Sequence, residues 1–232
     1  KSSVGVLFVH DRIGFNETNN IALQYAYRLR VFEKSTLSFG LEANGMFSKT
    51  DFSKYTRIMP ENDPALSAAQ ESQFTPNFGA GLYLSSDQYY VGLSAANLFE
   101  DGLNSDNSYT PTREYFVHGG YIHAITENVK LRGNVFARFV NPNLGDNPSS
   151  ADFNLSAIFQ DRFLLGASVR TDKTITGVAQ MQVTRHLNIA YAYDFKSGNY
   201  GSQAGNYHEI FLSFIFGEKN AKFATPRFVT YF

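Results

Sequence analysis

The chain has no cysteine, no tryptophan and no run of apolar residues long enough for a membrane-spanning helix. Without cysteine it can form no disulfide framework, thiolate metal site or cysteine nucleophile. A transmembrane helix needs about 20 predominantly apolar residues, so that way of crossing a bilayer is excluded. The formal net charge is −1, which argues against nucleic-acid binding, because that function requires a net basic surface.

Aromatic residues, in contrast, are abundant. The 232 residues include 22 phenylalanines and 14 tyrosines, and aromatic residues make up 16% of the chain. This content is high for a soluble protein but fits a barrel with aromatic girdles at both membrane interfaces. The mean hydropathy of −0.26 does not count against a membrane location, because the two faces of a barrel strand average out.

Alternation of apolar and polar residues is the main structural signal. In the segment 187–195, Leu187 and Ile189 share one face of an extended strand. Asn188 and Asp194 share the other face, because successive side chains of a strand point to opposite sides. Many such segments approach the 9–11 residues that a tilted strand needs to cross a bilayer. The predicted strands are 3–10, 20–30, 35–47, 74–84, 88–95, 113–124, 129–140, 150–159, 162–171, 174–183, 187–195 and 207–216.

The connections between these segments alternate in length. The short set is 31–34, 85–87, 125–128, 160–161 and 184–186. The other set is 11–19, 48–73, 96–112, 141–149, 172–173 and 196–206, of which only 172–173 is short. Short turns at one end and long loops at the other are typical of outer-membrane barrels. The sequence therefore predicts an all-β, transmembrane antiparallel up-and-down β-barrel, with short turns in the periplasm and long loops outside the cell.

The predicted domain organisation is simple. Residues 1–216 form the barrel, and the basic segment 217–232 is a periplasmic C-terminal tail. Within 48–73, Asp63 and Pro64 have the residue types of a helix N-cap and first helical position, so this loop is expected to contain one or two helical turns.

Candidate catalytic and metal sites are sparse. His118 and His123 are five residues apart on one predicted strand, so they face opposite ways and cannot share a metal without a bulge. The loop 101–107 carries several oxygen ligands but lacks EF-hand spacing, which favours a solvated turn-rich loop over a calcium site. The chain has no phosphate-binding or dinucleotide-binding fingerprint and no segment that nominates a Ser/His/Asp set. We predict a non-enzymatic protein with no cofactor and no metal.

Ten ionisable residues fall on the polar faces of the predicted strands and are expected to point into the barrel lumen. Such groups must be paired or solvated, because an unpaired buried charge costs several kcal/mol. Two interpretations remain open: an ion-pair network that fills the lumen, or the lining of an anion-leaning channel. The residues are Arg28, Arg30, Glu42, Lys130, Arg132, Arg138, Asp152, Arg170, Asp194 and Glu209.

Several segments together resemble the PorP/SprF family of the Bacteroidetes type IX secretion system. They are FTPNFGAGLYLSSDQYYVGLSAAN at 74–97, REYFVHGGY at 113–121, FLLGASVRT at 163–171, LNIAYAYDF at 187–195, HEIFLSF at 208–214 and TPRFVTYF at 225–232. The resemblance implies an outer-membrane barrel for secretion or gliding, which partners the C-terminal domains of secreted surface proteins and other secretion components. Family members begin with an aromatic, Asn-Pro-rich segment and a further hairpin. Neither is found here, so we expect fourteen strands in the complete protein.

The resemblance leads to a binding hypothesis and a transport hypothesis. In the first, long loops capture or anchor a secreted adhesin or another exported protein, because recognition usually sits on loops of a rigid scaffold. In the second, the basic lumen conducts small, anionic solutes across the outer membrane. A soluble β-sandwich lectin or adhesin is a third class, which would purify without detergent. The loop residues expected to contact a partner are Phe52, Tyr55, Arg57, Phe99 and Tyr109.

Overall fold

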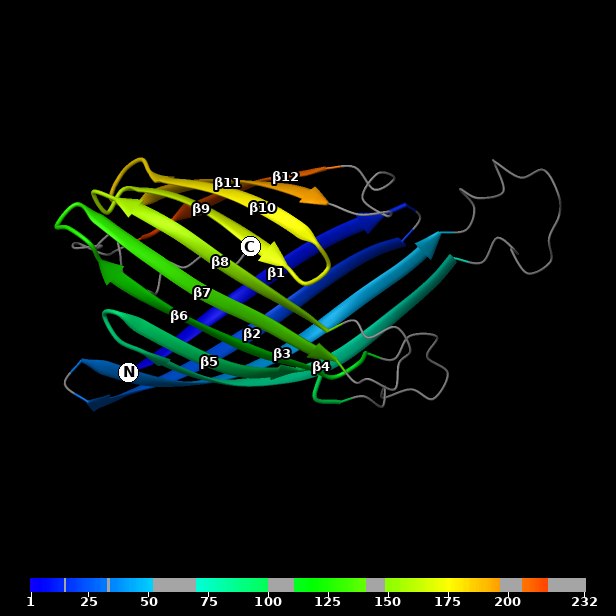
Figure 1. Cartoon of the computed structure of the whole chain (residues 1–232). Coiled ribbons are helices and arrows are strands. Elements are labelled where there is room, and N and C mark those ends of the chain that lie inside the picture. Colours follow the sequence, from blue (N-terminus) through cyan, green and yellow to red (C-terminus); the bar gives the residue numbers. More distant parts are fainter. Residues whose placement is uncertain are drawn as a thin grey trace. The chain divides into compact units, whose positions relative to one another are not determined.

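A computed structural model of the chain describes residues 1–14, 16–32, 34–51, 70–99, 111–140, 149–196 and 206–216. In these residues the regular structure consists of twelve strands, and each strand is hydrogen-bonded to its neighbours in the sequence (Figure 1). No helix in the same residues is long and apolar enough to cross a membrane. The strands are β1 (Ser2–Ile13), β2 (Asn16–Phe32), β3 (Ser35–Asp51), β4 (Gln70–Ser85), β5 (Tyr89–Ala96), β6 (Glu114–Ala124), β7 (Val129–Val140), β8 (Ser150–Phe159), β9 (Phe163–Arg170), β10 (Thr174–Gln182), β11 (Leu187–Lys196) and β12 (Tyr207–Phe214).

The chain divides into two compact units. Unit 1 comprises Lys1–Leu29, Ser38–Leu82 and Ser94–Glu114. Unit 2 comprises Arg30–Leu37, Tyr83–Leu93 and Tyr115–Phe232, so β7 to β12 lie wholly within it. The up-and-down order and the number of strands confirm the sequence-based prediction. The expected tail 217–232 and the expected helical turns after Asp63 lie outside the described residues.

One predicted loop is wrong. The sequence predicted a loop at 11–19. In the structure, however, β1 continues to Ile13 and β2 begins at Asn16, so that only residues 14 and 15 connect the two strands. The polar residues here pair across the two strands, as in the hydrogen bond between His10 Nδ1 and Asn19 Oδ1 at 2.8 Å. Gly14, at a φ of 62°, supplies the left-handed backbone conformation that a tight turn needs. The polar composition of 11–19 therefore predicted a loop where the two strands form a continuous hairpin.

Two strands are much longer than a bilayer requires. Strands β2 and β3 each contain 17 residues, which at about 3.3 Å per residue span roughly 55 Å. The loop predicted at 48–73 narrows to 52–69, because β3 continues to Asp51 and β4 begins at Gln70. A tilted strand crosses the hydrocarbon in 9–11 residues, so these strands extend beyond it.

Three of the short turns are closed by a side-chain hydroxyl at their first or second residue. Ser86 Oγ accepts hydrogen bonds from the amides of residues 88 and 89, at 3.2 and 3.0 Å. Thr126 Oγ1 accepts from residues 128 and 129, and Thr184 Oγ1 accepts from residues 186 and 187. These bonds satisfy amides that have no partner in the strand ladder, which lets the turns stay short without glycine or proline.

The β8–β9 turn uses a different device. Gln160 and Asp161 both have a positive φ, of 51° and 53°, and the amide of Arg162 donates to the carbonyl of Phe159 at 3.0 Å. Two central residues with positive φ define the mirror-image turn that suits the twist of a hairpin. Gln160 is not glycine, asparagine or aspartate, the types that adopt this conformation at low cost.

The two faces of the sheet in unit 2 differ sharply in exposure. Leu155 on β8 is 63% exposed, whereas its neighbour Ser156 is 2% exposed. We call the side that carries Leu155, Leu165 and Val169 the apolar face, and the side that carries Ser156 and Thr176 the polar face. Exposed apolar and buried polar side chains reverse the arrangement of a water-soluble protein and fit a sheet whose outer side meets lipid.

The assignment of the two faces can be tested with spin labels, since the chain has no native cysteine. In lipid vesicles, a label on Leu155→Cys should collide more with oxygen than with a water-soluble nickel chelate, because oxygen concentrates in hydrocarbon. A label on the adjacent Asn154→Cys should collide less with oxygen, because that side chain is on the polar face. Reversal of the two positions would contradict the assignment.

The strained turn gives a second prediction. Gln160→Asn should raise the free energy of unfolding by roughly 0.5–1 kcal/mol, because asparagine tolerates a positive φ better than glutamine. The matched control is Gln88→Asn in the β4–β5 turn, where the residue is not in the left-handed region. Thermal unfolding in detergent should show a rise of about 2 °C for the first variant alone. Equal midpoints for both variants would argue against strain at this turn.

Candidate functional site

Two ion pairs lie at the two ends of the polar face on β7 to β9. Lys130 Nζ is 2.6 Å from Asp161 Oδ1 and also donates to Oδ2 at 2.8 Å. Arg170 Nε donates to Asp152 Oδ1 at 2.9 Å, and these two residues are directly opposite each other on neighbouring strands. Each pair bridges elements that are adjacent in the chain, so each fixes one local register.

Neutral hydroxyl side chains donate further hydrogen bonds on this face. Thr176 Oγ1 donates to Asp194 Oδ1 at 2.6 Å across β10 and β11. Ser156 Oγ donates to Asn154 Oδ1 at 2.6 Å along β8. These contacts among the described residues of unit 2 are short and local, each within one strand or between neighbouring elements.

Aromatic rings occupy the polar face on β4 to β6. Tyr83, Tyr90 and His118 have ring centroids 5.5–6.0 Å apart, and Tyr90 is only 1% exposed. Two glycines make room for them. A Cβ at Gly120 would lie 2.6 Å from the ring of Tyr90, and a Cβ at Gly92 would lie 2.3 Å from the ring of His118. We call these three rings the aromatic cluster.

Arg132 stands apart from the other cations of this face. It is 8% exposed, and its buried Nε has no hydrogen-bond partner. Its cross-strand neighbour on β8 is Ser156. Tyr90 is near enough to interact with it electrostatically.

The remaining residues of the predicted lumen network differ in their surroundings. Glu42 accepts hydrogen bonds from Gln24 at 2.8 Å and Asn44 at 3.1 Å. Arg138 is half-buried and has an interaction partner. Exposed side chains are found at Arg28, Arg30 and Glu209. The ten residues thus form separate local groups, and their shared role in the lumen stays a prediction.

At the loop end, side-chain hydrogen bonds hold the backbone that follows β5. Asn77 Nδ2 donates to the carbonyl of Phe99 at 2.9 Å, and the amide of Phe99 donates to Asn77 Oδ1 at 3.2 Å. Arg113 donates to the carbonyl of Leu98 at 2.9 Å, and Asn97 Nδ2 donates to the carbonyl of residue 112. These bonds lie in unit 1 and fix the segment 97–99, which we call the Phe99 shelf.

Phe99 itself is presented to the surroundings. Its side chain is 57% exposed, and its ring packs edge-on against Phe78 with centroids 5.4 Å apart. Of the five predicted contact residues, it is the one within the described part of the chain. The other four lie outside that part: Phe52, Tyr55, Arg57 and Tyr109.

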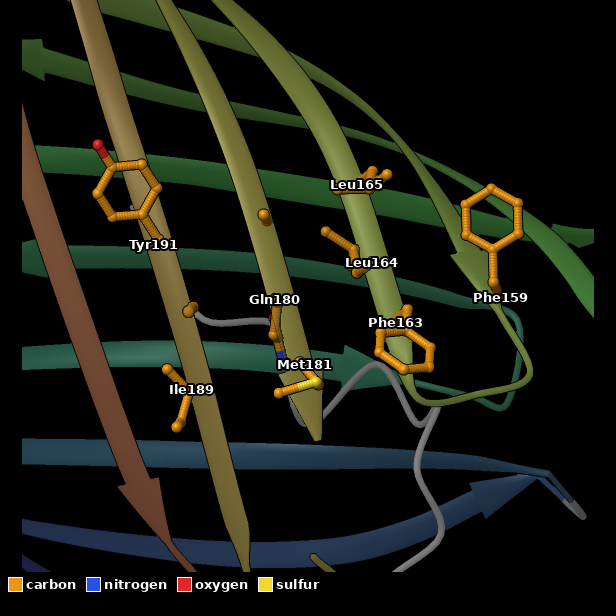
Figure 2. A pocket seen from close by; sticks show the side chains of 10 residues that line it. Phe159, Phe163, Leu164, Leu165, Gln180, Met181, Ile189 and Tyr191 are labelled. Atoms are coloured by element: carbon orange, nitrogen blue, oxygen red, sulfur yellow. The ribbon is translucent and has the colours of Figure 1, made fainter. Parts of the chain in front are cut away.

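The apolar face carries a groove of about 470 Å³ across β9, β10 and β11 (Figure 2). It forms because Ala179 on β10 lies opposite Leu165 on one side and Tyr191 on the other, so a small side chain separates two large ones. Figure 2 shows Phe163 and Met181 at the end of the groove. The lining is almost entirely apolar, and its chemistry suits a lipid acyl chain.

Sequence reasoning missed the aromatic cluster and the role of Asn77. The glycines at positions 92 and 120, set within an aromatic-rich stretch, are the signal that could have pointed to close packing of rings. Asn77 has no such signal, because its bonds join positions 22 residues apart in the chain. Asp161, which pairs with Lys130, was read as part of a turn only.

The Asp152–Arg170 pair gives a stability prediction. Asp152→Asn should lower the free energy of unfolding by about 1–3 kcal/mol, because it removes a charge-assisted hydrogen bond from a partly buried guanidinium. Exchange of the two residues, Asp152→Arg with Arg170→Asp, should recover part of the loss. The matched control is Glu209→Gln, an exposed carboxylate, which should change stability by less than about 0.5 kcal/mol. Equal losses in both single variants, measured by thermal unfolding in detergent, would contradict the prediction.

Comparison with known proteins gives one family. The model of the type IX secretion system membrane protein PorP/SprF family matches residues 1–214. This match includes all twelve strands, from Ser2 at the start of β1 to Phe214 at the end of β12. No curated protein matches the chain.

Proposed function

We propose that this chain, which belongs to the PorP/SprF family of type IX secretion system membrane proteins, binds the C-terminal domain of a secreted surface protein at its loop end. The protein acts as a non-enzymatic scaffold in the outer membrane. The observation that carries the proposal is the Phe99 shelf, an exposed aromatic residue held by hydrogen bonds where the connection 100–110 begins.

A fixed aromatic side chain is well suited to binding. Aromatic residues dominate binding hot spots, and truncation of one costs 2 kcal/mol or more where it fills a pocket. Ordering a flexible segment on binding would reduce the affinity, but Asn77 already holds the backbone at Phe99 in place. The shelf therefore offers a partner a preformed contact next to the connection 100–110.

The apolar face supports membrane anchoring of this scaffold. Exposed large side chains follow one another on β8, β9 and β12, such as Phe153, Leu165 and Ile210. Only a hydrocarbon surrounding makes such a face favourable. Within the proposal, the short turns face the periplasm with the segment 217–232, residues 1–216 form the barrel, and the long connections face outward, where an exported protein arrives. Other components of the secretion system are the second class of partner.

The packing of the polar face favours a filled scaffold over a solute channel. Arg132 is buried there, and so is Tyr90, whose ring packs with those of Tyr83 and His118 in the aromatic cluster. A channel lining requires charged groups that meet water. A planar-bilayer recording with a large, stable, anion-selective current would reverse this preference and support the channel.

The binding proposal is tested at Phe99 and at the residue that holds it. In the native host, Phe99→Ala should reduce co-purification of the secreted partner by tenfold or more, since loss of a hot-spot aromatic costs about 2 kcal/mol. Asn77→Ala should give a smaller reduction, because it loosens the shelf without removing the ring. Recovery is measured by quantitative mass spectrometry after detergent solubilisation.

The matched control is Phe153→Ala, which removes an exposed phenylalanine from the apolar face. It should leave partner recovery unchanged. In a further variant, an Asn-Gly link replaces residues 52–69 and removes one long connection. Full recovery in both Phe99→Ala and this loop variant would overturn the proposal that the partner binds at the loop end.

A further inference from the structure

Arg132 on β7 is a buried cation without a counter-charge. Its side chain is 8% exposed, and this fraction includes exposure to any space that water can enter. Its Nε makes no hydrogen bond. A guanidinium in such a position loses its hydration, and an unpaired buried charge costs several kcal/mol. Some anionic group must offset that loss if the arrangement is to persist.

The carboxylates of the same face are engaged elsewhere. Asp161 binds Lys130, and Asp152 binds Arg170. Asp194 accepts a hydrogen bond from Thr176 on β10. None of these pairings includes Arg132, so the described residues of this face bind each other and leave its charge uncompensated.

The cross-strand neighbours of Arg132 carry no charge. Directly across on β8 is Ser156, and across from Ser156 on β9 is Gly166. The hydroxyl of Ser156 already donates to Asn154. Tyr90 interacts with Arg132 electrostatically, but a neutral phenol supplies no counter-charge. The described neighbours thus provide hydrogen-bonding groups, but no negative charge.

A second unpartnered group lies on the same face of the same strand. Asn134 Oδ1 is buried and has no hydrogen-bond partner. It is two residues from Arg132, so the two Cα atoms are about 7 Å apart and the side chains point the same way. The guanidinium needs an acceptor and the amide oxygen needs a donor. Carboxylate and sulfate offer acceptors only, whereas hydrogen phosphate offers acceptors and an O–H donor in one group.

We propose that Arg132 and Asn134 form a binding site for a phosphate-type oxyanion on the polar face of β7. The ligand is hydrogen phosphate or the terminal group of a phosphomonoester. Arg132 binds it as a charge-assisted donor, and Asn134 accepts from its hydroxyl. The site is separate from the Phe99 shelf, and its existence does not depend on the binding of a secreted protein.

The test uses the purified full chain in detergent at constant ionic strength. Phosphate, sulfate and acetate are compared by calorimetric titration and by thermal unfolding. The wild-type chain should bind phosphate more tightly than sulfate or acetate, with a rise of about 5 °C when phosphate reaches about 100 times its dissociation constant. Arg132→Gln should weaken phosphate binding at least tenfold, which would cut the rise at the same phosphate concentration by about half or more. The matched control is Arg28→Gln, an exposed arginine on β2, which should behave as the wild type.

Further experiments separate the contribution of Asn134 from that of Arg132, and distinguish free phosphate from a phosphomonoester as the ligand. Asn134→Ala should retain anion binding but lose the preference for phosphate over sulfate. Glycerol phosphate that binds as tightly as inorganic phosphate would identify the terminal group of a larger molecule as ligand, and weaker binding would identify the free ion. If Arg132→Gln does not fold, Arg132→Lys replaces it and should bind more weakly than the wild type.

The proposal is overturned by either of two results. The first is equal phosphate affinity in the wild-type and Arg132 variants. The second is a thermal shift of the same size from all three anions in every variant, which would be a general salt effect. Both results leave the binding experiment at Phe99 unaffected, because no secreted partner is present in these titrations.

Discussion

The transfer of one face of the sheet into hydrocarbon is the interaction on which the rest of the structure depends. On β8, Leu155 is 63% exposed, whereas the adjacent Ser156 is only 2% exposed. In water this arrangement would expose apolar area strand after strand and promote aggregation. In a bilayer the same area lies in its favoured solvent, and the paired backbone groups need no water. The turns, the polar face and the loop end can then be read as consequences of this sidedness.

Charged side chains on the polar face of such a sheet need ion pairs or hydrogen bonds with other groups. Lys130 and Arg170 do so with carboxylates one strand away, so that each pair also fixes a register. Thr176 and Asp194 achieve a similar result with one charged group. Arg132 is the exception on these strands, and an exception of this kind is informative because uncompensated burial is costly. An anion from outside the chain is therefore expected where the side chains of the chain leave a buried positive charge unpaired.

The strands could be predicted from sequence because alternation survives in them almost without interruption. The pattern over 129–140 and 150–159 gives β7 and β8 with the observed ends. It failed at 11–19, where polar residues on both sides of Gly14 pair with each other and leave no apolar stripe to read. Candidate site residues were harder to find. The exposure of Phe99 fits its loop position, but the hold of Asn77 on it depends on contacts between distant segments, which periodicity does not encode. The burial of Arg132 is likewise a product of packing.

The hydroxyl-closed turns also bear on how the protein assembles. At Ser86, Thr126 and Thr184, the bonds that shape the turn join residues two or three positions apart. Their formation needs no distant part of the chain, and local contacts carry the smallest loop-closure entropy. Each of these turns can therefore nucleate its hairpin before the long connections at the other end are ordered. Assembly would proceed by successive hairpins, each formed from its turn outward, and the end with the long connections would be completed last.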